Sequence, residues 1–453
     1  MTNILEKVKG LIRKLENKGK ELILGGDLLN LELLIQEELQ SLNRALLQDL
    51  LEQLGTSKEF RKAIGKLRCS LSLGKLKRRK IRIQIGTGDY IEIESWYATK
   101  GRNLCYKGNC HMSLLYWGCI KKASPLYYSR ASLVSILCPS FDVAQQILAH
   151  FGIKGQYNRM RDLSIALGDK AVQLGAAVLL EQGESLENKR VVISIDGGRS
   201  RTRAYTGSVN SKGNATFDTP WKEPKVFVIQ ILNEQGQPEK KFSLPFYGAT
   251  MGNIEVAIER LKDALKALQI QKAKAIQFIA DGAACFWRRM RQVFISLGVS
   301  TKKVTYTLDY YHALEHLHEF LHELVELLPC QQHTKEELKK KFKNFLWDGA
   351  IYSIEKRVKQ QLLQAEQQMD ETLKTALNYF IKHTDRMQYY KFKRNKWLCG
   401  SGIMESAIRR IINLRFKSAS SFWLSENLES LISLRCIFLA GRWDLFIKNV
   451  SKN

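Results

Sequence analysis

The sequence predicts an α/β protein: a mixed sheet with helices, interrupted by an all-α insertion and preceded by mostly helical regions. Three observations support this fold class. Apolar β-type runs alternate with helical patterns between 187 and 312, which is the order of an α/β layer arrangement. From 313 to 399 the pattern is helical and polar. Before residue 187, helical periodicity dominates.

A chain of 453 residues is too long for one compact core. Changes in periodicity and charge divide it into several expected regions. These are an N-terminal helical region at 1–57, a basic α/β region at 58–139, a helix-turn-helix-like region at 140–186, the first part of the α/β core at 187–312, the helical insertion at 313–399, and the completion of the core with C-terminal helices at 400–453.

The composition is strongly basic, with 71 Lys and Arg against 45 Asp and Glu and a net charge of +26. This surplus causes self-repulsion unless a polyanion neutralises it, so nucleic acid is the expected partner. No run approaches 18 consecutive apolar residues, and the N-terminus lacks the apolar core of a signal peptide. The nine Cys are scattered. We therefore expect a cytoplasmic, nucleoid-associated protein with reduced thiols and no membrane partner.

Residues 1–55 are expected to form two helices. Leucine and isoleucine recur at steps of three and four from Leu28 to Leu46, which predicts a continuous apolar stripe. Packing within the subunit is the main interpretation of this stripe. Self-association is a second one, although the repeat is too short and irregular for a coiled coil.

The densest basic stretch runs from Lys58 to Arg82, where apolar residues interleave with the cations. Such a pattern suits an ordered surface that faces phosphate, and we expect DNA contact from Lys77, Arg78, Arg79 and Lys80. The following segment, 81–96, alternates in the β manner around a turn at 86–89.

Residues 140–168 resemble a helix-turn-helix unit with its turn at 152–155. Lys154, Arg159 and Arg161 cluster at the turn and the start of the second helix, where a recognition helix would meet a duplex. We expect these cations to contact DNA. Two short helices with a Gly turn are also common in any α-rich protein.

The α/β core is expected to have three strands, a helix, a strand, a second helix and a last strand. The expected elements are strands at 191–195, 205–209 and 226–232, a helix at 253–268, a strand at 275–280, a helix through 290 and a strand at 304–308. Beyond the insertion, Glu405 lies near the start of a helical pattern with one apolar face.

Two of the expected strands end abruptly in Asp-Gly, at Asp196 and Asp281. Asp-Gly after a β run is also the commonest turn signal. Together with Glu405, however, these residues offer three carboxylates on separate rigid elements. Such a set can hold two Mg²⁺ or Mn²⁺ ions, which prefer oxygen ligands and support phosphodiester chemistry.

Three other patterns favour other chemistry. His318-Glu319-x-x-His322 matches the helical zinc-protease motif, and His312 and His316 repeat its spacing, but no third ligand accompanies them. Ile195 to Gly198 followed by Thr202 is similar to a phosphate loop of a sugar kinase or actin-like ATPase, without a second Gly-rich loop. A zinc module would draw on Cys105, Cys110, Cys119 and Cys138 with His111, whose spacings lack the tight pair of a zinc ribbon.

The four acidic motifs together resemble bacterial insertion-sequence transposases with an Asp-Asp-Glu active site, close to the Mutator-like lineage. Asp196, Asp281 and Glu405 match the family triad, and Asp309 with His312 matches its Asp-x-x-His element. The resemblance covers roughly 191–423. It implies an RNase H-like mixed five-stranded sheet, with Asp196, Asp281 and Glu405 as metal ligands and Asp309 and His312 in support.

The resemblance also implies Mg²⁺-dependent cleavage at element ends, strand transfer into target DNA, and a homo-oligomer assembled on double-stranded DNA. Zinc is not expected. Phosphate contacts near the chemistry would come from Arg199, Arg409, Arg410, Arg415 and Lys417. Trp423 would stack on an unpaired base, or anchor the C-terminal helices as a core aromatic. A transposase-derived DNA-binding protein that no longer cuts is the main alternative, and a zinc metalloprotease is a weaker one.

Overall fold

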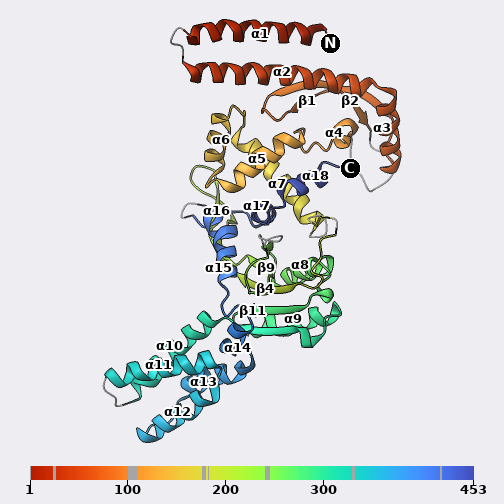
Figure 1. The fold of residues 1–453 in the computed structure, drawn as a ribbon. Coiled ribbons are helices and arrows are strands. Elements are labelled where there is room, and N and C mark those ends of the chain that lie inside the picture. The colour runs from red at the N-terminus through yellow and green to blue at the C-terminus, as the bar shows by residue number, and fades with distance from the viewer. Residues whose placement is uncertain are drawn as a thin grey trace. The chain divides into compact units, whose positions relative to one another are not determined.

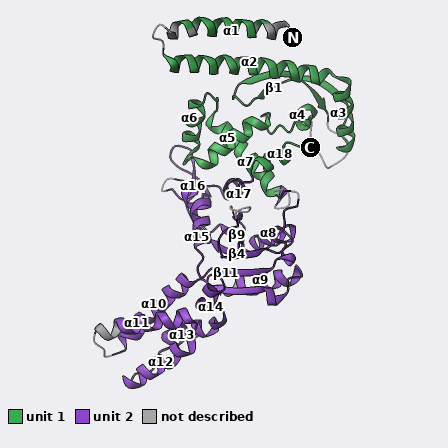
Figure 2. Cartoon of the chain, viewed as in Figure 1, with its two compact units in different colours: residues 1–173, 443–453 green, residues 174–442 purple. Residues whose placement is uncertain are grey.

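A computed structural model gives the fold (Figure 1). The structure describes residues 2–23, 27–99, 110–175, 180–181, 183–239, 245–328, 332–418 and 421–452. The chain divides into two compact units, unit 1 with residues 1–173 and 443–453 and unit 2 with residues 174–442 (Figure 2). None of the described helices combines the length and the apolar character that crossing a bilayer needs.

Unit 1 begins with a helical hairpin and a third helix. The helices are α1 (Thr2–Ile23), α2 (Leu28–Thr56) and α3 (Lys58–Ser70). Asp27 caps α2 by accepting from the Leu29 N–H, and Ser57 caps α3 by accepting from the Phe60 N–H. Two helices over the first 55 residues are therefore confirmed. Two leucines of the predicted stripe, Leu28 and Leu39, are exposed, and the others are half-buried.

The basic region folds as a small antiparallel sheet, in the order β1 (Leu76–Gln84), β2 (Tyr90–Ala98), β3 (Cys110–His111). Isoleucines at alternate positions of β1 and β2 are buried together with Leu114. Arg82, between Ile81 and Ile83, is exposed, so the alternation predicted from Ile81 holds there, while residues 77–80 before it are all exposed. The strand itself begins at Leu76, earlier than expected.

Helices complete unit 1. They are α4 (Met112–Tyr116), α5 (Pro125–Leu137), α6 (Phe141–His150), α7 (Tyr157–Leu174) and, from the far end of the chain, α18 (Trp443–Val450). Helices α6 and α7 are the two helices of the predicted helix-turn-helix unit. The Trp443 indole donates to the Ser129 hydroxyl at 3.0 Å, which ties α18 to α5. The sequence analysis did not foresee this association.

Unit 2 is built on a mixed five-stranded sheet in the order β10-β9-β4-β11-β12. Its strands are β4 (Arg190–Gly197), β9 (Lys225–Leu232), β10 (Phe246–Thr250), β11 (Ala275–Ala280) and β12 (Val304–Leu308). Strand β9 is antiparallel to β4 and β10, while β11 is parallel to β4 and β12. This sheet is compatible with the RNase H-like arrangement that the resemblance implies.

One expected strand lies elsewhere. Residues 205–209 form a strand, β6 (Ala204–Val209), but it pairs only with β7 (Ala215–Asp218) in a separate exposed ribbon. The short strands β5 (Ser200–Arg201) and β8 (Trp221–Lys222) pair beside it. The third strand of the sheet along the chain is β10, where the Phe227 ring covers Gly248: a Cβ there would lie 2.1 Å from the ring. A five-residue strand with a central glycine gives little β signal.

Helices α8 (Ile254–Ala267), α9 (Ala284–Ser296), α15 (Gly402–Ile408) and α17 (Ser425–Leu439) surround this sheet. Between β12 and α15 lie the helices of the insertion, α10 (Tyr310–Glu326), α11 (Gln332–Asp348), α12 (Ile351–Gln364), α13 (Glu371–Lys382) and α14 (Tyr389–Arg394). A helical insertion at this place is what the sequence predicts.

Candidate active site at the ends of strands β4 and β11

Asp196 and Asp281 occupy equivalent positions on two adjacent parallel strands. Ser194 of β4 pairs with Ile279 of β11, and each Asp follows two residues later. The Asp196 Oδ1 accepts from the Gly197 N–H at 2.6 Å, and the Asp281 Oδ1 accepts from the Ala283 N–H at 3.1 Å. Both side chains are half-buried. The sheet therefore places the two carboxylates side by side at its C-terminal edge, as the sequence predicts.

A third carboxylate, Glu223, lies next to Asp196 and was missed by the sequence analysis. A Cβ on Gly197 would lie 1.7 Å from the Glu223 Oε1, so a larger residue at 197 would displace this side chain. Lys225, which pairs with Gly197 across β4 and β9, holds Glu223 by an ion pair of 2.8 Å. Only the pairing of β9 with β4 reveals Glu223, because its local sequence carries no signal.

The three residues Asp196, Asp281 and Glu223, here called the carboxylate edge, repel one another. Burial raises the pKa of Asp196, and the negative charges of Asp281 and Glu223 raise it further. The Gly197 N–H and the Lys225 ammonium act in the opposite direction. The balance favours a bound cation or proton at Asp196.

Helix α15 carries Glu405 beside this edge. The helix packs against β4 and β9. A Cβ on Gly198 would lie 3.2 Å from the Ile412 side chain and 3.4 Å from that of Ile408, so the turn after Asp196 runs against the Glu405 helix. Glu405 itself is exposed. The helix continues into a π-helical turn (Arg409–Asn413), a feature found frequently at functional sites.

Asp309 links the two sides of the site. Its backbone N–H donates to the Ala280 carbonyl at 3.0 Å, directly before Asp281. Its carboxylate accepts from the Tyr311 N–H at 2.7 Å, from the Ser401 N–H at 3.0 Å and from the Ser401 hydroxyl. With only 5% of its surface exposed, Asp309 is a positioning residue that fixes the start of α15 to the end of β11.

His312 points along its own helix. Its Nδ1 lies 3.7 Å from the Glu315 Oε2, and its ring lies 4.7 Å from that of His316. The His316 ring in turn lies 4.4 Å from that of Tyr379 of α13. The Tyr379 hydroxyl blocks the space above Gly282, where a Cβ would be 2.6 Å away. His312 thus begins a row of rings that reaches the residue after Asp281.

Within the described ranges, no group of three or more His, Cys, Asp or Glu side chains is arranged to hold a metal ion. Asp196 and Asp281 still fit a divalent cation, because they are adjacent oxygen donors that repel each other. The exposed Glu405 lies on the neighbouring helix without joining them. His318 and His322 lie on the exposed side of α10.

Three of the four cysteines considered for a zinc module lie within the described residues. Cys105 lies outside the described residues. Cys110 and Cys138 are buried, and burial raises the pKa of Cys119 to about 12.

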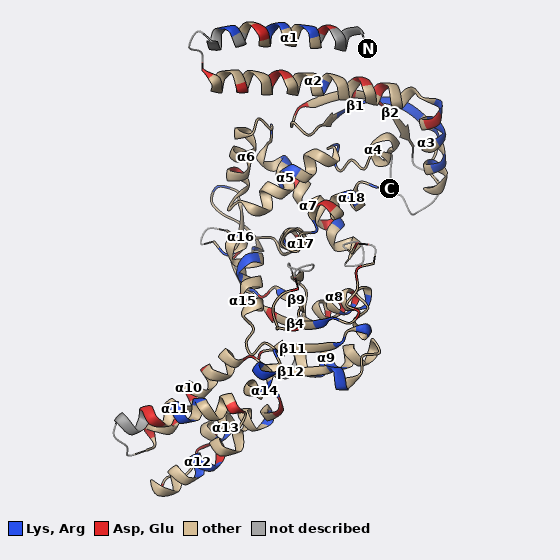
Figure 3. Ribbon diagram, viewed as in Figure 1, with Lys and Arg blue, Asp and Glu red and all other residues tan. Residues whose placement is uncertain are grey.

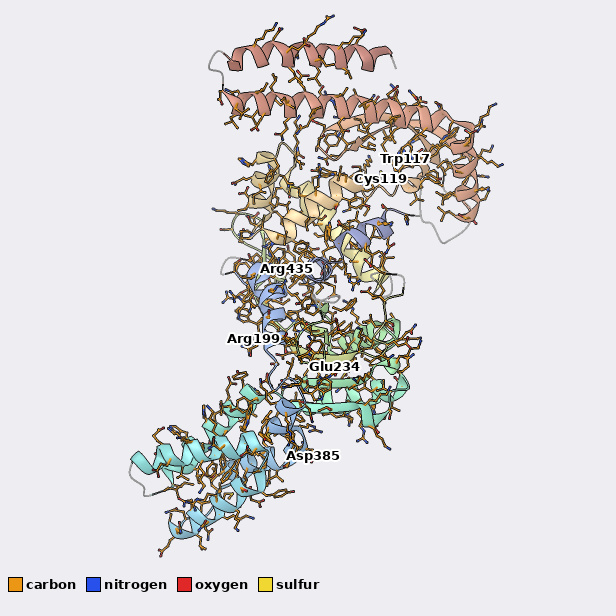
Figure 4. All side chains as sticks on the ribbon, in the orientation of Figure 1. Trp117, Cys119, Arg199, Glu234, Asp385 and Arg435 are labelled. Carbon is orange, nitrogen blue, oxygen red and sulfur yellow. The ribbon has the colours of Figure 1, made fainter. Side chains whose placement is uncertain are left out.

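The basic residues predicted near the chemistry divide into two groups. Arg199, Arg409 and Lys417 are exposed (Figure 4 labels Arg199), and Arg410 is half-buried, donating to the Tyr247 hydroxyl at 3.3 Å. Arg415 is 3% exposed and stacks over the Trp423 ring at 5.0 Å. The interpretation of Arg415 as a phosphate contact does not fit this placement, because the side chain is enclosed.

Trp423 is held by backbone and ring contacts. Its N–H donates to the Arg201 carbonyl at 3.2 Å, its carbonyl accepts from the Arg203 N–H at 2.8 Å, and its ring lies 5.3 Å from that of Phe416. The structure favours the anchoring interpretation of Trp423 over base stacking.

In unit 1, Lys77, Arg78, Arg79 and Lys80 are all exposed on β1. Figure 3 colours the Lys and Arg of the ribbon blue and the Asp and Glu red. Arg78 pairs with Glu94 at 2.8 Å, Lys80 with Glu92 at 3.4 Å, and Arg79 stacks over Tyr97 at 4.3 Å. The run is therefore partly neutralised by the neighbouring strand.

The three cations predicted to contact DNA at α6 and α7 also have partners. Lys154 pairs with Asp89 at 2.7 Å and Arg161 with Asp162 at 3.0 Å. Arg159 donates to the Gln84 Oε1 at 3.3 Å and to the Lys121 carbonyl. Of the three predicted cations, Arg159 alone has only neutral partners among the hydrogen bonds and ion pairs of the described residues.

No protein-family model matches the chain, and no curated protein sequence matches it. Among solved structures it is similar to a Drosophila P element transposase strand transfer complex. The two are 11% identical, over 75% of this chain and 84% of the other, with a TM-score of 0.24. A likeness at this level carries no inference about activity.

Proposed function

We propose that the protein is a DNA transposase that cleaves and joins DNA ends at an Asp-Asp-Glu site. One observation carries the proposal: Asp196 and Asp281 stand at equivalent positions of adjacent parallel strands, and the Glu405 helix packs against the first of them. Mutually repelling carboxylates at a sheet edge are what a divalent cation needs. The net charge of +26 fits a DNA partner.

In this proposal Asp196 and Asp281 hold Mg²⁺ or Mn²⁺, and Glu405 completes the set. Two such ions would activate the attacking oxygen and stabilise the leaving oxygen of a phosphodiester. Asp309 positions the Glu405 helix, and Lys225 keeps Glu223 beside Asp196. The exposed Arg199, Arg409 and Lys417 attract the DNA backbone. Joining two element ends to a target requires a homo-oligomer on double-stranded DNA.

The test is a cleavage assay on a supercoiled plasmid that carries the DNA flanking the gene. Purified wild type, Asp196→Asn and Glu405→Gln are incubated with Mg²⁺ or Mn²⁺, and nicked, linear and strand-transfer products are scored. Asp263→Asn, an exposed carboxylate on α8, is the matched control. We expect products at the gene borders with wild type and control and none with the two site variants. Products that persist in both site variants would refute the proposed site.

A second candidate is a transposase-derived DNA-binding protein that does not cut. It is favoured by the exposed position of Glu405 and by the lack of a three-ligand group in the described part of the chain. Tight DNA binding without products from any form, in either metal, would establish it. A zinc protease would instead degrade casein in the presence of zinc and lose that activity on His318→Ala.

A further inference from the structure

A groove of about 620 Å³ opens on the small sheet of unit 1. Its lining is Lys80, Ile81, Arg82, Tyr90, His111, Lys122 and Arg159. These residues come from β1, β2, β3, the turn before α5, and the start of α7. The groove, here called the basic groove, therefore has four permanent cations and no carboxylate among its lining residues.

Among the described residues, three of the four cations have no carboxylate partner. Lys80 pairs with Glu92 at 3.4 Å, but both side chains are largely exposed, so this pair is weak. No described carboxylate pairs with Arg82, Lys122 or Arg159. Arg159 is fixed in place by the Gln84 side chain and the Lys121 carbonyl, which leaves its charge uncompensated.

The backbone that presents Lys122 is strained. Lys121 and Lys122 have φ of 46° and 62°, so two consecutive non-glycine residues adopt the left-handed conformation. The Gln84 N–H donates to the Lys122 carbonyl at 2.9 Å and its carbonyl accepts from the Ser124 N–H at 2.9 Å, which holds the turn against β1. Such strain persists where the surroundings impose it, and it clusters at ligand sites.

The groove also offers ring and hydrogen-bonding groups. The Arg82 guanidinium lies 5.1 Å from the centre of the Tyr90 ring, which restrains it within the groove. The Nδ1 of His111 is buried, and no described residue forms a hydrogen bond with it. Burial and the charges of Lys122 and Arg79 lower the pKa of His111, so the positive charge of the groove comes from its Lys and Arg side chains.

We propose that the basic groove binds the phosphodiester backbone of duplex DNA. Lys80 and Arg82 are two residues apart on an extended strand, a separation of about 6.7 Å, and point to the same face of the small sheet. A row of cations along β1, joined by Lys122 and Arg159, suits the row of negative charges along a DNA backbone. The proposal rests on the proposed function for its partner, but it requires binding only and no cleavage.

The test measures binding of the full chain to a fluorescent 30-base-pair duplex by anisotropy, in EDTA, across a series of salt concentrations. The double variant Arg82→Gln/Lys122→Gly removes two groove charges, and glycine accepts the left-handed backbone at 122. The matched control, Lys448→Gln/Lys121→Gly, removes two exposed charges outside the groove, one of them from the neighbouring left-handed position. Thermal melting checks that both double variants keep the fold.

We expect the groove variant to bind about 100-fold more weakly at 50 mM salt, with a log–log salt slope shallower by about 1.8, because two phosphate contacts are lost. The control should change far less in both. Equal losses in groove variant and control would overturn the proposal, since charge alone would then explain binding. Displacement of DNA by micromolar pyrophosphate would also overturn it, by showing a site for small phosphate compounds.

The binding assay is independent of the chemistry. Asp263→Asn should bind the duplex as tightly as wild type, because this exposed carboxylate on α8 belongs neither to the groove nor to the carboxylate edge. Absence of cleavage by wild type, with the groove result intact, would therefore refute the transposase and leave the DNA contact standing.

Discussion

The carboxylate edge of unit 2 and the basic groove of unit 1 have opposite charge but share one property: each gathers like charges with too little counter-charge. In the first, Asp281 and Glu223 oppose ionisation of Asp196. In the second, Arg82, Lys122 and Arg159 stand around one groove. Folding against such repulsion costs free energy, so both arrangements indicate ligands of the opposite sign: a divalent cation for one, a phosphate backbone for the other.

Removing one charge from the carboxylate edge should have the largest effect, because it tests directly whether this region binds a divalent cation. We expect Asp281→Asn to lower plasmid cleavage by three or more orders of magnitude, about 4 kcal/mol of transition-state stabilisation. The variant should also lose the rise in melting temperature that Mg²⁺ gives the wild type, because the cation no longer has paired ligands. Calorimetry with and without Mg²⁺ measures this second effect. If Mg²⁺ raised the melting temperature of the variant as much as that of wild type, Asp281 would not be a metal ligand.

His383 offers a third case, in which a buried titratable group lies among positive charges. Unlike the two regions, it avoids repulsion by staying neutral. Burial and the charges of Arg386 and Lys382 lower its pKa from 6.5 to about 4, and it is 2% exposed. In the unfolded chain His383 binds a proton as the pH falls below 6.5, whereas in the folded chain it binds one only near pH 4. The free energy of unfolding should therefore fall as pH falls through this window, by up to about 3 kcal/mol.

Denaturant unfolding at pH 7.5 and pH 4.5 measures this loss. His383→Gln keeps a polar group beside Arg386, whose guanidinium lies 2.8 Å from the His383 Nδ1, but cannot titrate. Its loss of stability between the two pH values should be smaller than that of wild type. The same loss in both proteins would show that His383 does not titrate as described.

A substitution that destabilises unit 2 should have a smaller effect, and it distinguishes the carboxylate edge from the basic groove. Gly248→Ala would place a methyl group against the Phe227 ring between β9 and β10, behind the carboxylate edge. Overpacking of this kind costs about 2 kcal/mol, so the melting temperature of unit 2 should fall by about 4–8 °C. DNA binding by the basic groove should persist at temperatures where unit 2 is unfolded. Gly402→Ala, which meets open space, is the control, and an equal fall there would contradict the packing argument.

Much of the fold follows from local sequence. The β-branched runs at 191–195, 226–232, 275–280 and 304–308 predicted four strands of the sheet, and the structure has them as β4, β9, β11 and β12. Strand β10 was missed, because Gly248 interrupts a run of five residues. The exposed ribbon that contains 205–209 has the alternation of a sheet strand, so pattern alone placed it wrongly.

The candidate active site was likewise predictable in part from local sequence. The proximity of Asp196 and Asp281 was predictable, since each ends a strand of one parallel pair. Glu223 and the enclosed Arg415 were not, because strand pairing and side-chain packing decide their positions. The basic groove was hidden for the same reason: its cations come from segments as distant as Lys80 and Arg159.

The Asp309 carboxylate joins the two ends of the helical insertion, which allows the insertion to vary in length. It accepts from residues at both ends of the helical excursion, Tyr311 at its start and Ser401 92 residues after Asp309. An appendage whose two ends meet at one side chain can change length without moving the chain that carries it, because the entropy of closing a longer loop rises only slowly. The helices between β12 and α15 are thus an insertion whose two ends are both fixed at Asp309. Its length can change without altering the positions of Asp196 and Asp281.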